Sequence, residues 1–468
     1  MSWRRHPLAA AAPLVLAAAA LLWLHDLEAR PWATLAVLTA AVAAFAHAIV
    51  RLRGTTLGAP LLVLVALALR LCLLPLPPTL SDDVYRYLWD GRVAAAGRNP
   101  YFHSPDDTDL APLRDVMWER VGHREVETVY PPFAIAAFSI AARLPRPLLA
   151  WKAMLTTVDL LSCLLLLWLA RARGVPTGRC VAYAWNPLVV LEVAGMAHVD
   201  ALGVAPLLAA ALLLVEHRGE TPPLAREEAS RAPFPYGPTG LRRGLAAGAL
   251  LGLAILAKLV PLLVLPAWTR ASLRRALFVL GALGLVALAT VPFALGAPGP
   301  PPGLVTYAVS WEFNGPLFEP LWRVLDAAGA APWLKARIDG LKEATGRHDA
   351  WNRVYPFVYP QLLAKALLAL ALVAVTAASL RRADPVEAAF LVFAGMLLLS
   401  ATVYPWYALW VLPWAALLWR VPWLILSSSL FLAYLPRLLD VPLLPWPFLL
   451  VWCPFLIGLW WARSRATG

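Results

Sequence analysis

The most distinctive stretch of the chain is Ser81–Tyr101, with the sequence SDDVYRYLWDGRVAAAGRNPY. It is strongly polar, whereas the chain around it is largely apolar. A serine stands where a helix N-cap belongs, and a glycine followed by Asn-Pro closes the pattern. These signals predict a helix from about Asp82 to Ala96, beside the membrane surface.

Two adjacent carboxylates, Asp82 and Asp83, open this predicted helix. The helix dipole favours negative charge in a first turn, so both are expected to stay ionised. At helical spacing Arg86 shares a face with Asp82, and Asp90 shares a face with Asp83. An ionised carboxylate held at a membrane surface is what a general base requires. The alternative interpretation is a charged N-cap on an ordinary surface helix.

The composition indicates a polytopic membrane protein. Of the 468 residues, 61% are hydrophobic and only 15% are charged, and the mean hydropathy is +0.67. Soluble domains are about half apolar and about a quarter charged. The net charge of +12 does not indicate nucleic-acid binding, because the arginines flank apolar runs, where they set topology. The four cysteines are scattered and predict neither a disulfide framework nor a metal site.

The apolar runs predict an all-α bundle of about 13 or 14 transmembrane helices, several of them shorter than the ~20 residues of a straight span. The run 243–268 carries Lys258 and Pro261 near its middle, which predicts two short helices that meet at a bend. The basic pair Arg4–Arg5 and the apolar run 8–24 resemble a signal peptide. They lack a small-residue cleavage site, so a retained first span is expected.

The positions of the basic residues predict the orientation. Most arginine-rich loops share the cytoplasmic side if 131–147 does not cross the membrane and 243–268 goes out and back. The competing topology, in which 131–147 crosses, exposes more arginines outside. The favoured topology places both termini and a linker loop, 216–243, on the cytoplasmic side. The Ala-, Leu-, Arg- and Pro-rich composition suits a bacterial plasma membrane. Four polar regions then lie outside: 77–147, the turn around His198, 297–360 and the turn at Tyr404.

Ionisable residues at membrane depth are costly and often functional. Three of them occupy the turn Glu192–Ala201 (EVAGMAHVDA), where the alternative is polar residues that simply fill a hairpin turn. Lys258 and Arg70 are candidate cations for an anionic lipid headgroup, and snorkelling to the interface is the alternative. Aromatic residues with polar neighbours, around Trp311 and in 404–407, suit sugar rings but are equally expected in an interfacial belt.

Five motifs, in order between about residues 80 and 407, resemble the bacterial branch of the GT-C membrane glycosyltransferases. They are SDDVYRYLWDGRV…AGRNPY, VYPP at Val129–Pro132, EVAGMAHVDALG, AKLVPLLVLP and YPWY. This group includes mannosyltransferase-like proteins that use polyprenyl-phosphate sugars. The resemblance implies a GT-C-like bundle, an outer loop with short interfacial helices, and an Asp general base. That base corresponds to Asp83, with Asp82 as a close alternative. Met196 and Ala197 depart from the polar pattern of many relatives in their turn.

The resemblance implies a single displacement with inversion, in which a mannose-like hexose passes from the lipid phosphate to an acceptor hydroxyl. The predicted donor-phosphate ligands are Lys258, Arg70 and Arg86. The predicted substrate-binding residues are Tyr85, Asp90, Glu192, His198, Asp200, Trp311, Tyr404, Trp406 and Tyr407. A divalent cation such as Mg or Mn could assist, although no ligand spacing argues for one. The acceptor is left open as a glycan, a lipid or a protein.

Two other functional classes fit parts of the sequence. A secondary transporter or lipid-sugar flippase uses intramembrane charges, inverted repeats and ionisable residues near the midplane. A non-catalytic membrane subunit would present the outer loops to partners. The polar residues collect at one membrane boundary and in long loops, which favours chemistry over passage.

Overall fold

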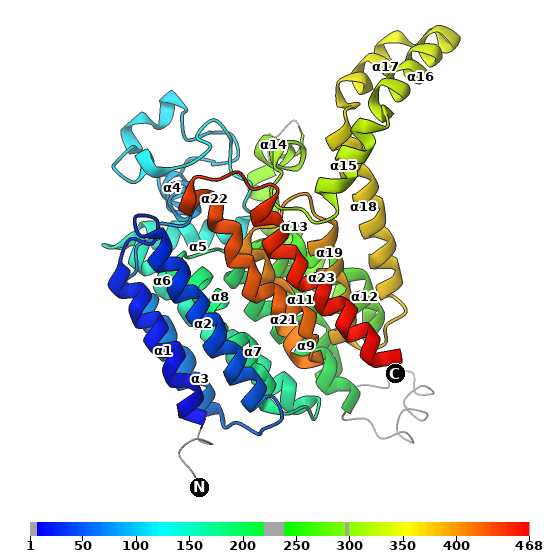
Figure 1. Cartoon of the computed structure of the whole chain (residues 1–468). Helices are drawn as coiled ribbons and strands as arrows, with labels where there is room; N and C mark the ends of the chain where they lie inside the picture. The colour runs from blue at the N-terminus through cyan, green and yellow to red at the C-terminus, as the bar shows by residue number, and fades with distance from the viewer. Residues whose placement is uncertain (1–6, 220–237, 295–298, 468) are drawn as a thin grey trace, which may run out of the picture.

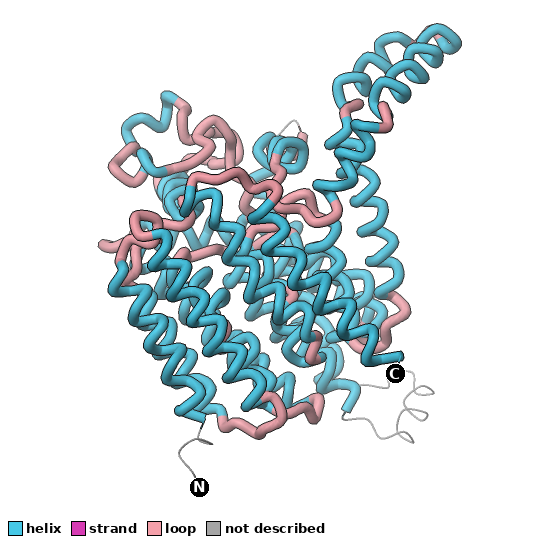
Figure 2. The backbone as a smooth tube through the Cα atoms, viewed as in Figure 1, coloured by secondary structure: helices cyan, strands magenta, loops and turns pink. Residues whose placement is uncertain are grey.

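The computed structural model describes residues 7–219, 238–294 and 299–467. Arg4–Arg5 and most of the linker 216–243 therefore lie outside the described residues. Regular structure in the described part is helical, apart from an isolated bridge pairing of 313–314 with Thr402. Eight described helices are long and apolar enough to cross a membrane, or nine if one bent pair counts as a span. The all-α polytopic fold is thus as predicted (Figures 1 and 2).

The helices of the first half are α1 (Pro7–Leu24), α2 (Pro31–Leu52), α3 (Ala59–Leu73), α4 (Asp83–Ala95), α5 (Pro132–Ala142), α6 (Pro147–Ala172), α7 (Val181–Ala184), α8 (Pro187–Val190) and α9 (Asp200–Gly219). Those of the second half are α11 (Pro238–Ala257), α12 (Leu265–Ala271), α13 (Arg275–Ala294), α14 (Pro302–Ser310), α15 (Phe318–Ala327), α16 (Ala330–Thr345), α17 (His348–Val354), α18 (Pro360–Ser379), α19 (Pro385–Leu399), α20 (Leu412–Leu418), α21 (Val421–Ser429), α22 (Leu435–Leu439) and α23 (Trp446–Thr467).

Continuous spans are fewer than the 13 or 14 expected from the apolar runs. Several of those runs form short helices that change direction inside the bundle, such as α7, α8 and α20. Prolines explain much of this segmentation, because proline is favoured at the first position of a helix and breaks one in its interior. The helices α6, α18 and α19 all begin at a proline. Buried helix breaks are tolerated where neighbouring protein satisfies the freed backbone groups.

The run around Lys258 goes out and back, as the favoured topology requires. Helix α11 ends at Ala257, and the chain then returns through a short 3₁₀ turn and α12. Helix α13 runs parallel to α11: a Cβ at Gly248 would lie 2.0 Å from Phe278 O, and one at Gly252 would lie 2.6 Å from Ala282 O. Two parallel neighbours need a return segment between them, so Lys258 stands at the turning point.

The segment 131–147 contributes only α5, whose 11 residues make a helix of about 16 Å, too short to cross a bilayer. Most of its side chains are buried, and it packs directly beneath α4. A Cβ at Gly91 of α4 would lie 2.4 Å from the backbone oxygen of Phe138. Helix α5 is therefore a buried support for α4.

The second outer region, 297–360, differs in shape from the first. Helices α16 and α17 project beyond the bundle on a stalk formed by α15 and the start of α18 (Figure 1). Two small apolar clusters hold this arm together, one centred on Phe318 and the other on Ile338. The first outer region forms an irregular loop above α4 at the same end of the bundle (Figure 2). The long polar regions therefore gather at one end of the molecule.

We expect Gly248→Leu to lower the stability of the bundle by about 1–3 kcal/mol, because the new side chain would be forced against the α13 backbone. Thermal unfolding of the purified protein in detergent measures the effect. Gly284→Ala on α13 is the matched control, since a Cβ there would meet only Leu280 Cδ1, at 3.7 Å. Equal melting temperatures for Gly248→Leu and the wild type would contradict the close α11–α13 packing.

Candidate active site

A cavity of about 510 Å³ lies at the end of the bundle that carries the long polar regions. We refer to it as the main cavity. Its lining residues come from α4 and the residues just before it, the loop 121–131, the break at Lys258, α14 and its following turn, the end of α19, and the segments 404–410 and 433–437. Segments that lie more than 300 residues apart in the sequence thus build one site. The sequence-predicted residues that line it are Asp82, Asp83, Arg86, Lys258, Trp311, Tyr404, Trp406 and Tyr407.

Helix α4 places the two carboxylates at the cavity. It spans Asp83–Ala95, within one residue of the predicted bounds at each end. The Ser81 hydroxyl, one residue before the N-cap Asp82, accepts a 3.3 Å hydrogen bond from the backbone N–H of Asp83. Gly97 follows the helix with φ +75, a left-handed conformation that suits glycine. The glycine signal at the C-terminal end therefore acts as predicted, whereas the N-cap residue is Asp82 and not the predicted Ser81.

Asp83 sits in a less polar environment than an ordinary surface carboxylate. Burial raises its pKa, and the neighbouring Asp82 raises it too, whereas His198 and Lys258 oppose this shift. The hydroxyl of Tyr87 donates a 3.3 Å hydrogen bond to Asp83 Oδ2. A carboxylate with a raised pKa is a stronger base when ionised, which suits proton abstraction from a hydroxyl.

Lys258 occupies the break between α11 and the following turn, and it faces the cavity. Its ammonium donates two 2.8 Å hydrogen bonds to the carboxylate of Asp200 and lies 4.4 Å from the ring centre of Tyr407. Asp200 is fully buried and also accepts a hydrogen bond from Trp410 Nε1. The side chain of Lys258 remains 20% exposed. Asp200 therefore holds the cation in place while one side stays open to an anionic ligand.

The turn Glu192–Ala201 lies behind the cavity wall. It includes a π-helical turn, Leu191–Gly195, and Ala197 in a left-handed conformation. Glu192, His198 and Asp200 are all fully buried and do not line the cavity. The prediction that these three bind substrate is therefore wrong, because packed side chains separate them from the open space.

These buried groups instead contact residues that do line the cavity. His198 Nε2 lies 3.1 Å from Ser81 Oγ, and its ring stacks on Trp406 with centres 3.6 Å apart. His198 Nδ1 lies 2.8 Å from Glu192 Oε2, and the hydroxyl of Tyr434 donates to Glu192. A buried network thus positions the start of α4 and part of the aromatic wall, a role typical of satisfied buried polar groups.

Two further predicted substrate contacts, Tyr85 and Asp90, also face away from the main cavity. The Tyr85 hydroxyl accepts a 2.6 Å hydrogen bond from Arg120. Asp90 is 2% exposed and pairs with Arg86 across one helical turn, at 2.8 Å. Arg86 does line the cavity, but it also donates to the backbone oxygens of His123 and Val126. Its guanidinium ties α4 to the loop above it.

Arg70 is not available to a phosphate, which corrects the prediction made for it. The side chain is fully buried, and Arg70 Nε donates a 2.6 Å hydrogen bond to Asp159 Oδ2. Arg70 Nη1 donates to the backbone oxygens of Ala66 and Ala184, and the Tyr183 hydroxyl donates to the other oxygen of Asp159. The guanidinium serves an ion pair between α3 and α6, away from the main cavity.

An aromatic wall lines the same cavity as the carboxylates. The rings of Phe313, Tyr404 and Trp406 stack in sequence, with centres 4.7 Å and 4.5 Å apart. The hydroxyls of Tyr307 and Tyr407 share a short hydrogen bond. Stacked aromatic faces with hydroxyls at their edge suit the apolar faces and hydroxyls of a sugar.

The sequence-based predictions missed several cavity residues. They are Tyr87, His123, Glu127, Tyr130, Tyr307, Tyr434 and Arg437. Tyr130 belongs to the VYPP motif, to which the family resemblance assigns no particular role. Tyr87 lies one helical turn after Asp83, so the spacing in the predicted helix could have identified it. The remaining residues lie in loops or in apolar runs with no pattern of their own, and only the folded chain brings them to the cavity.

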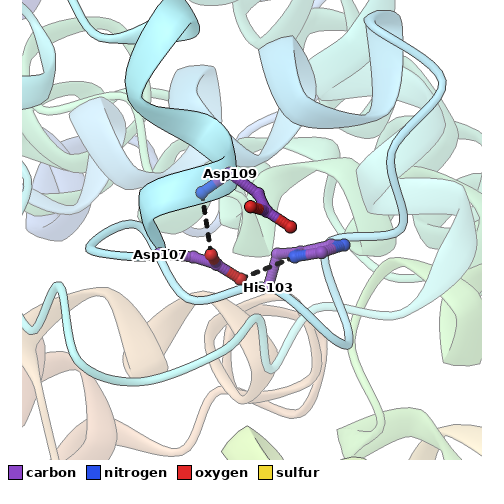
Figure 3. A group of neighbouring side chains, drawn as sticks. All are labelled: His103, Asp107 and Asp109. Atoms are coloured by element: carbon purple, nitrogen blue, oxygen red, sulfur yellow. Dashed lines mark hydrogen bonds and ion pairs between the residues drawn. The ribbon is translucent and has the colours of Figure 1, made fainter.

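Three potential metal ligands lie together in the first outer loop (Figure 3), and no other such group occurs among the described residues. They are His103, Asp107 and Asp109, with their ligand atoms within 4.8 Å of one another. The group does not line the main cavity. Asp107 accepts from His103 at 2.7 Å and from the backbone N–H of Asp109 at 3.0 Å, and the bond to His103 lowers its pKa. These contacts are those of a capped turn.

A family model described as alpha-(1->6)-mannopyranosyltransferase, N-terminal domain, matches residues 2–274, which is more than half of the chain. The matched range includes the two carboxylates of α4 and Lys258. No curated protein and no solved structure matches the chain.

We expect Arg70→Met to destabilise the protein by about 3–5 kcal/mol, because Asp159 would remain buried without its cation. The double variant Arg70→Met/Asp159→Leu should recover much of this loss. Thermal unfolding in detergent measures both, with Arg98→Met on the exposed end of the α4 region as the control. An Arg70→Met protein that unfolds like the wild type would contradict a purely structural role.

Proposed function

We propose, from the premise that the chain belongs to the alpha-(1->6)-mannopyranosyltransferase family, that it transfers mannose from a polyprenyl-phosphate donor to an acceptor hydroxyl. The chain is a polytopic membrane glycosyltransferase by family and fold. The observation that carries the finer proposal is that Asp83 and Lys258 line the same cavity at one end of the membrane bundle. A base and a cation are the two groups that this reaction needs.

Asp83 acts as the general base in this mechanism. Its carboxylate takes the proton from the acceptor hydroxyl while the hydroxyl oxygen attacks the anomeric carbon of the donor. The bond from that carbon to the phosphate oxygen breaks, and the lipid phosphate leaves with the electron pair. One displacement inverts the anomeric configuration. The family description names an alpha-(1->6) linkage, so the proposed acceptor group is the primary hydroxyl of a mannose residue in a glycan.

Lys258 stabilises the leaving phosphate. Negative charge develops on the phosphate as the bond breaks, and a fixed cation in a cavity of low dielectric lowers the energy of that charge. The ion pair with Asp200 supports this role, because it fixes the ammonium without covering all of it. Arg437, which also lines the cavity, is a second cation within the same space.

The site lies on the extracytoplasmic side in this proposal. The opposite end of the bundle carries arginines of several loops: Arg53 and Arg179 flank the ring of Trp419, and Arg173 pairs with Asp384. Basic residues favour the cytoplasmic side of a membrane. A bacterial plasma membrane with the long polar regions outside agrees with this distribution.

A transporter is a less suitable function for this arrangement. Transport needs polar groups that line a path through the bundle. The buried pair of Arg70 and Asp159 bonds to protein atoms and lies outside the main cavity. The cavity residues instead concentrate at one end, where a lipid headgroup and a glycan can meet.

We expect Asp83→Asn to lower the transfer rate by about 10²–10⁴-fold, the usual contribution of a general base. The assay uses purified protein, a mannosyl-phosphoryl polyprenol donor and an α-mannoside acceptor, and measures the lipid phosphate released. Asp82→Asn is the matched control and should retain far more activity. Full turnover by Asp83→Asn would remove this residue from the role of base, and no transfer by the wild type would contradict the proposed donor.

We expect the rate to fall on the acid side of its pH profile, because Asp83 must be ionised to accept a proton. Its pKa is raised by burial, so the fall should occur at a higher pH than for an ordinary Asp, whose pKa is about 3.9. Asp82→Asn removes a like charge and should shift the acid limb to lower pH. Lys258→Met removes a cation and should shift it to higher pH. An acid limb that neither change moves would contradict the assignment.

A further inference from the structure

The hydroxyl of Tyr87 is a buried donor that contacts the proposed base. Tyr87 follows Asp83 by four residues on α4, so the two side chains share one face of the helix. The hydroxyl donates to Asp83 Oδ2 at 3.3 Å. Tyr87 is only 1% exposed, and a phenol that bulk water does not reach needs a protein partner. Asp83 supplies that partner.

Three aromatic side chains hold the ring of Tyr87 in place. The ring of Phe138, on α5, stacks on it with centres 4.9 Å apart and planes 6° apart. The rings of Tyr130 and Trp151 meet it edge-on, with centres 5.0 and 6.1 Å away. These three residues come from the loop before α5, from α5 and from α6. The hydroxyl therefore cannot turn away from the carboxylate unless three segments unpack.

This aromatic cage is itself fixed at two points. A Cβ at Gly91 would lie 2.4 Å from the backbone oxygen of Phe138, so the glycine allows α5 to approach α4 closely enough for the rings to stack. The indole N–H of Trp151 donates a 3.0 Å hydrogen bond to Ala197 O. Ala197 lies in the same buried turn as Asp200. The cage is thus tied to the turn that holds the cation of the site.

We propose that Tyr87 is a positioning residue for the general base: its fixed hydroxyl holds Asp83 Oδ2 and leaves Asp83 Oδ1 to take the proton of the acceptor hydroxyl. This inference rests on the proposed role of Asp83. Tyr87 transfers no proton itself and acts only through the carboxylate. A hydrogen bond to a carboxylate also favours its ionised form, which is the form that accepts a proton.

The direction of this effect follows from the environment of Asp83. Burial is the largest influence and raises the pKa of Asp83, whereas the hydrogen bond from Tyr87 lowers it. Loss of the hydroxyl should therefore raise the pKa further and move the acid limb of the rate to higher pH. The other titratable groups that act on Asp83 stay in place when only this hydroxyl is removed. They are Asp82, Tyr130, His198, Lys258, Tyr307, Tyr404 and Tyr434.

The test uses Tyr87→Phe in the full-length protein in detergent, because phenylalanine keeps the ring and its stacking partners. Tyr85→Phe is the matched control: it removes a hydroxyl from the same helix, one that accepts from Arg120 and does not line the main cavity. Asp83→Asn and the double variant Tyr87→Phe/Asp83→Asn complete the set. The rate with mannosyl-phosphoryl polyprenol and an α-mannoside is measured across pH, together with thermal unfolding.

We expect Tyr87→Phe to move the acid limb of kcat/KM to higher pH by about one unit, the size expected for a hydrogen bond to a charged group. At the pH optimum kcat should fall about tenfold, because a less constrained carboxylate adopts the reactive geometry less often. The KM for the donor should change little. Tyr85→Phe should behave like the wild type, and Tyr87→Phe should cause no further loss of rate in the Asp83→Asn protein.

An acid limb that stays in place in Tyr87→Phe, while Asp83→Asn is strongly impaired, would overturn this inference and leave the proposed base intact. A lower melting temperature without a shifted limb would do the same, since it would show a structural role alone. A further loss of rate in the double variant would mean that the hydroxyl acts independently of Asp83, which also contradicts the assignment. Full turnover by Asp83→Asn would instead contradict the proposed mechanism itself.

Discussion

The site depends on the buried ion pair between Asp200 and Lys258. Asp200 is fully buried at the start of α9, and a lone carboxylate there would pay a large desolvation cost. Lys258 compensates that charge with two hydrogen bonds of 2.8 Å, and the indole N–H of Trp410 adds a third. The pair joins two segments that are 58 residues apart, and it places an ammonium at the cavity wall.

Interruptions between helices allow the chain to bring Asp200 and Lys258 together. In a continuous helix through Lys258, the backbone groups would be hydrogen-bonded within the helix, and the lysine would lie on one face of a membrane-spanning segment. Instead α11 ends at Ala257, and the segment before Asp200 bends by 119° through a π-helical turn. Irregular backbone at membrane depth is tolerated where it is buried in protein or lines a cavity. The break at Lys258 lines the main cavity, and the break before Asp200 lies directly behind its wall, so irregular helix segments contribute to the site at both places.

The sequence predicted the local parts of this structure well. Composition indicated the membrane fold, and the capping pattern around Ser81–Tyr101 located α4 within one residue at each end. The bend at Lys258 followed from a charged residue and a proline inside an apolar run. These features depend on short-range chemistry, such as capping, proline geometry and hydropathy, which a single sequence displays directly.

The predictions that depended on long-range contacts were less successful. Nothing in the sequence distinguishes Arg70, which is satisfied by Asp159, from Lys258, which reaches the cavity, because the deciding partners lie 89 and 58 residues away. The residues of the His198 turn were expected to meet substrate, and they lie behind the wall instead. An ionisable residue in an apolar run indicates that its charge is paired with another polar or charged group. Whether that partner is protein or ligand is decided by the packing.

The residues around Asp83 form two layers, one that lines the main cavity and one that is buried behind it. The groups that face the cavity must stay accessible to a ligand on one side, even where, like Lys258, they are paired with protein on the other. The groups behind them, His198 and Glu192, can be fully buried because Ser81, Trp406 and Tyr434 surround them. His198 and Glu192 contact each other, and each also contacts a residue that lines the cavity. The buried layer thus fixes the positions of residues at the cavity wall. Fixed polar groups of this kind are what preorganised electrostatic stabilisation requires.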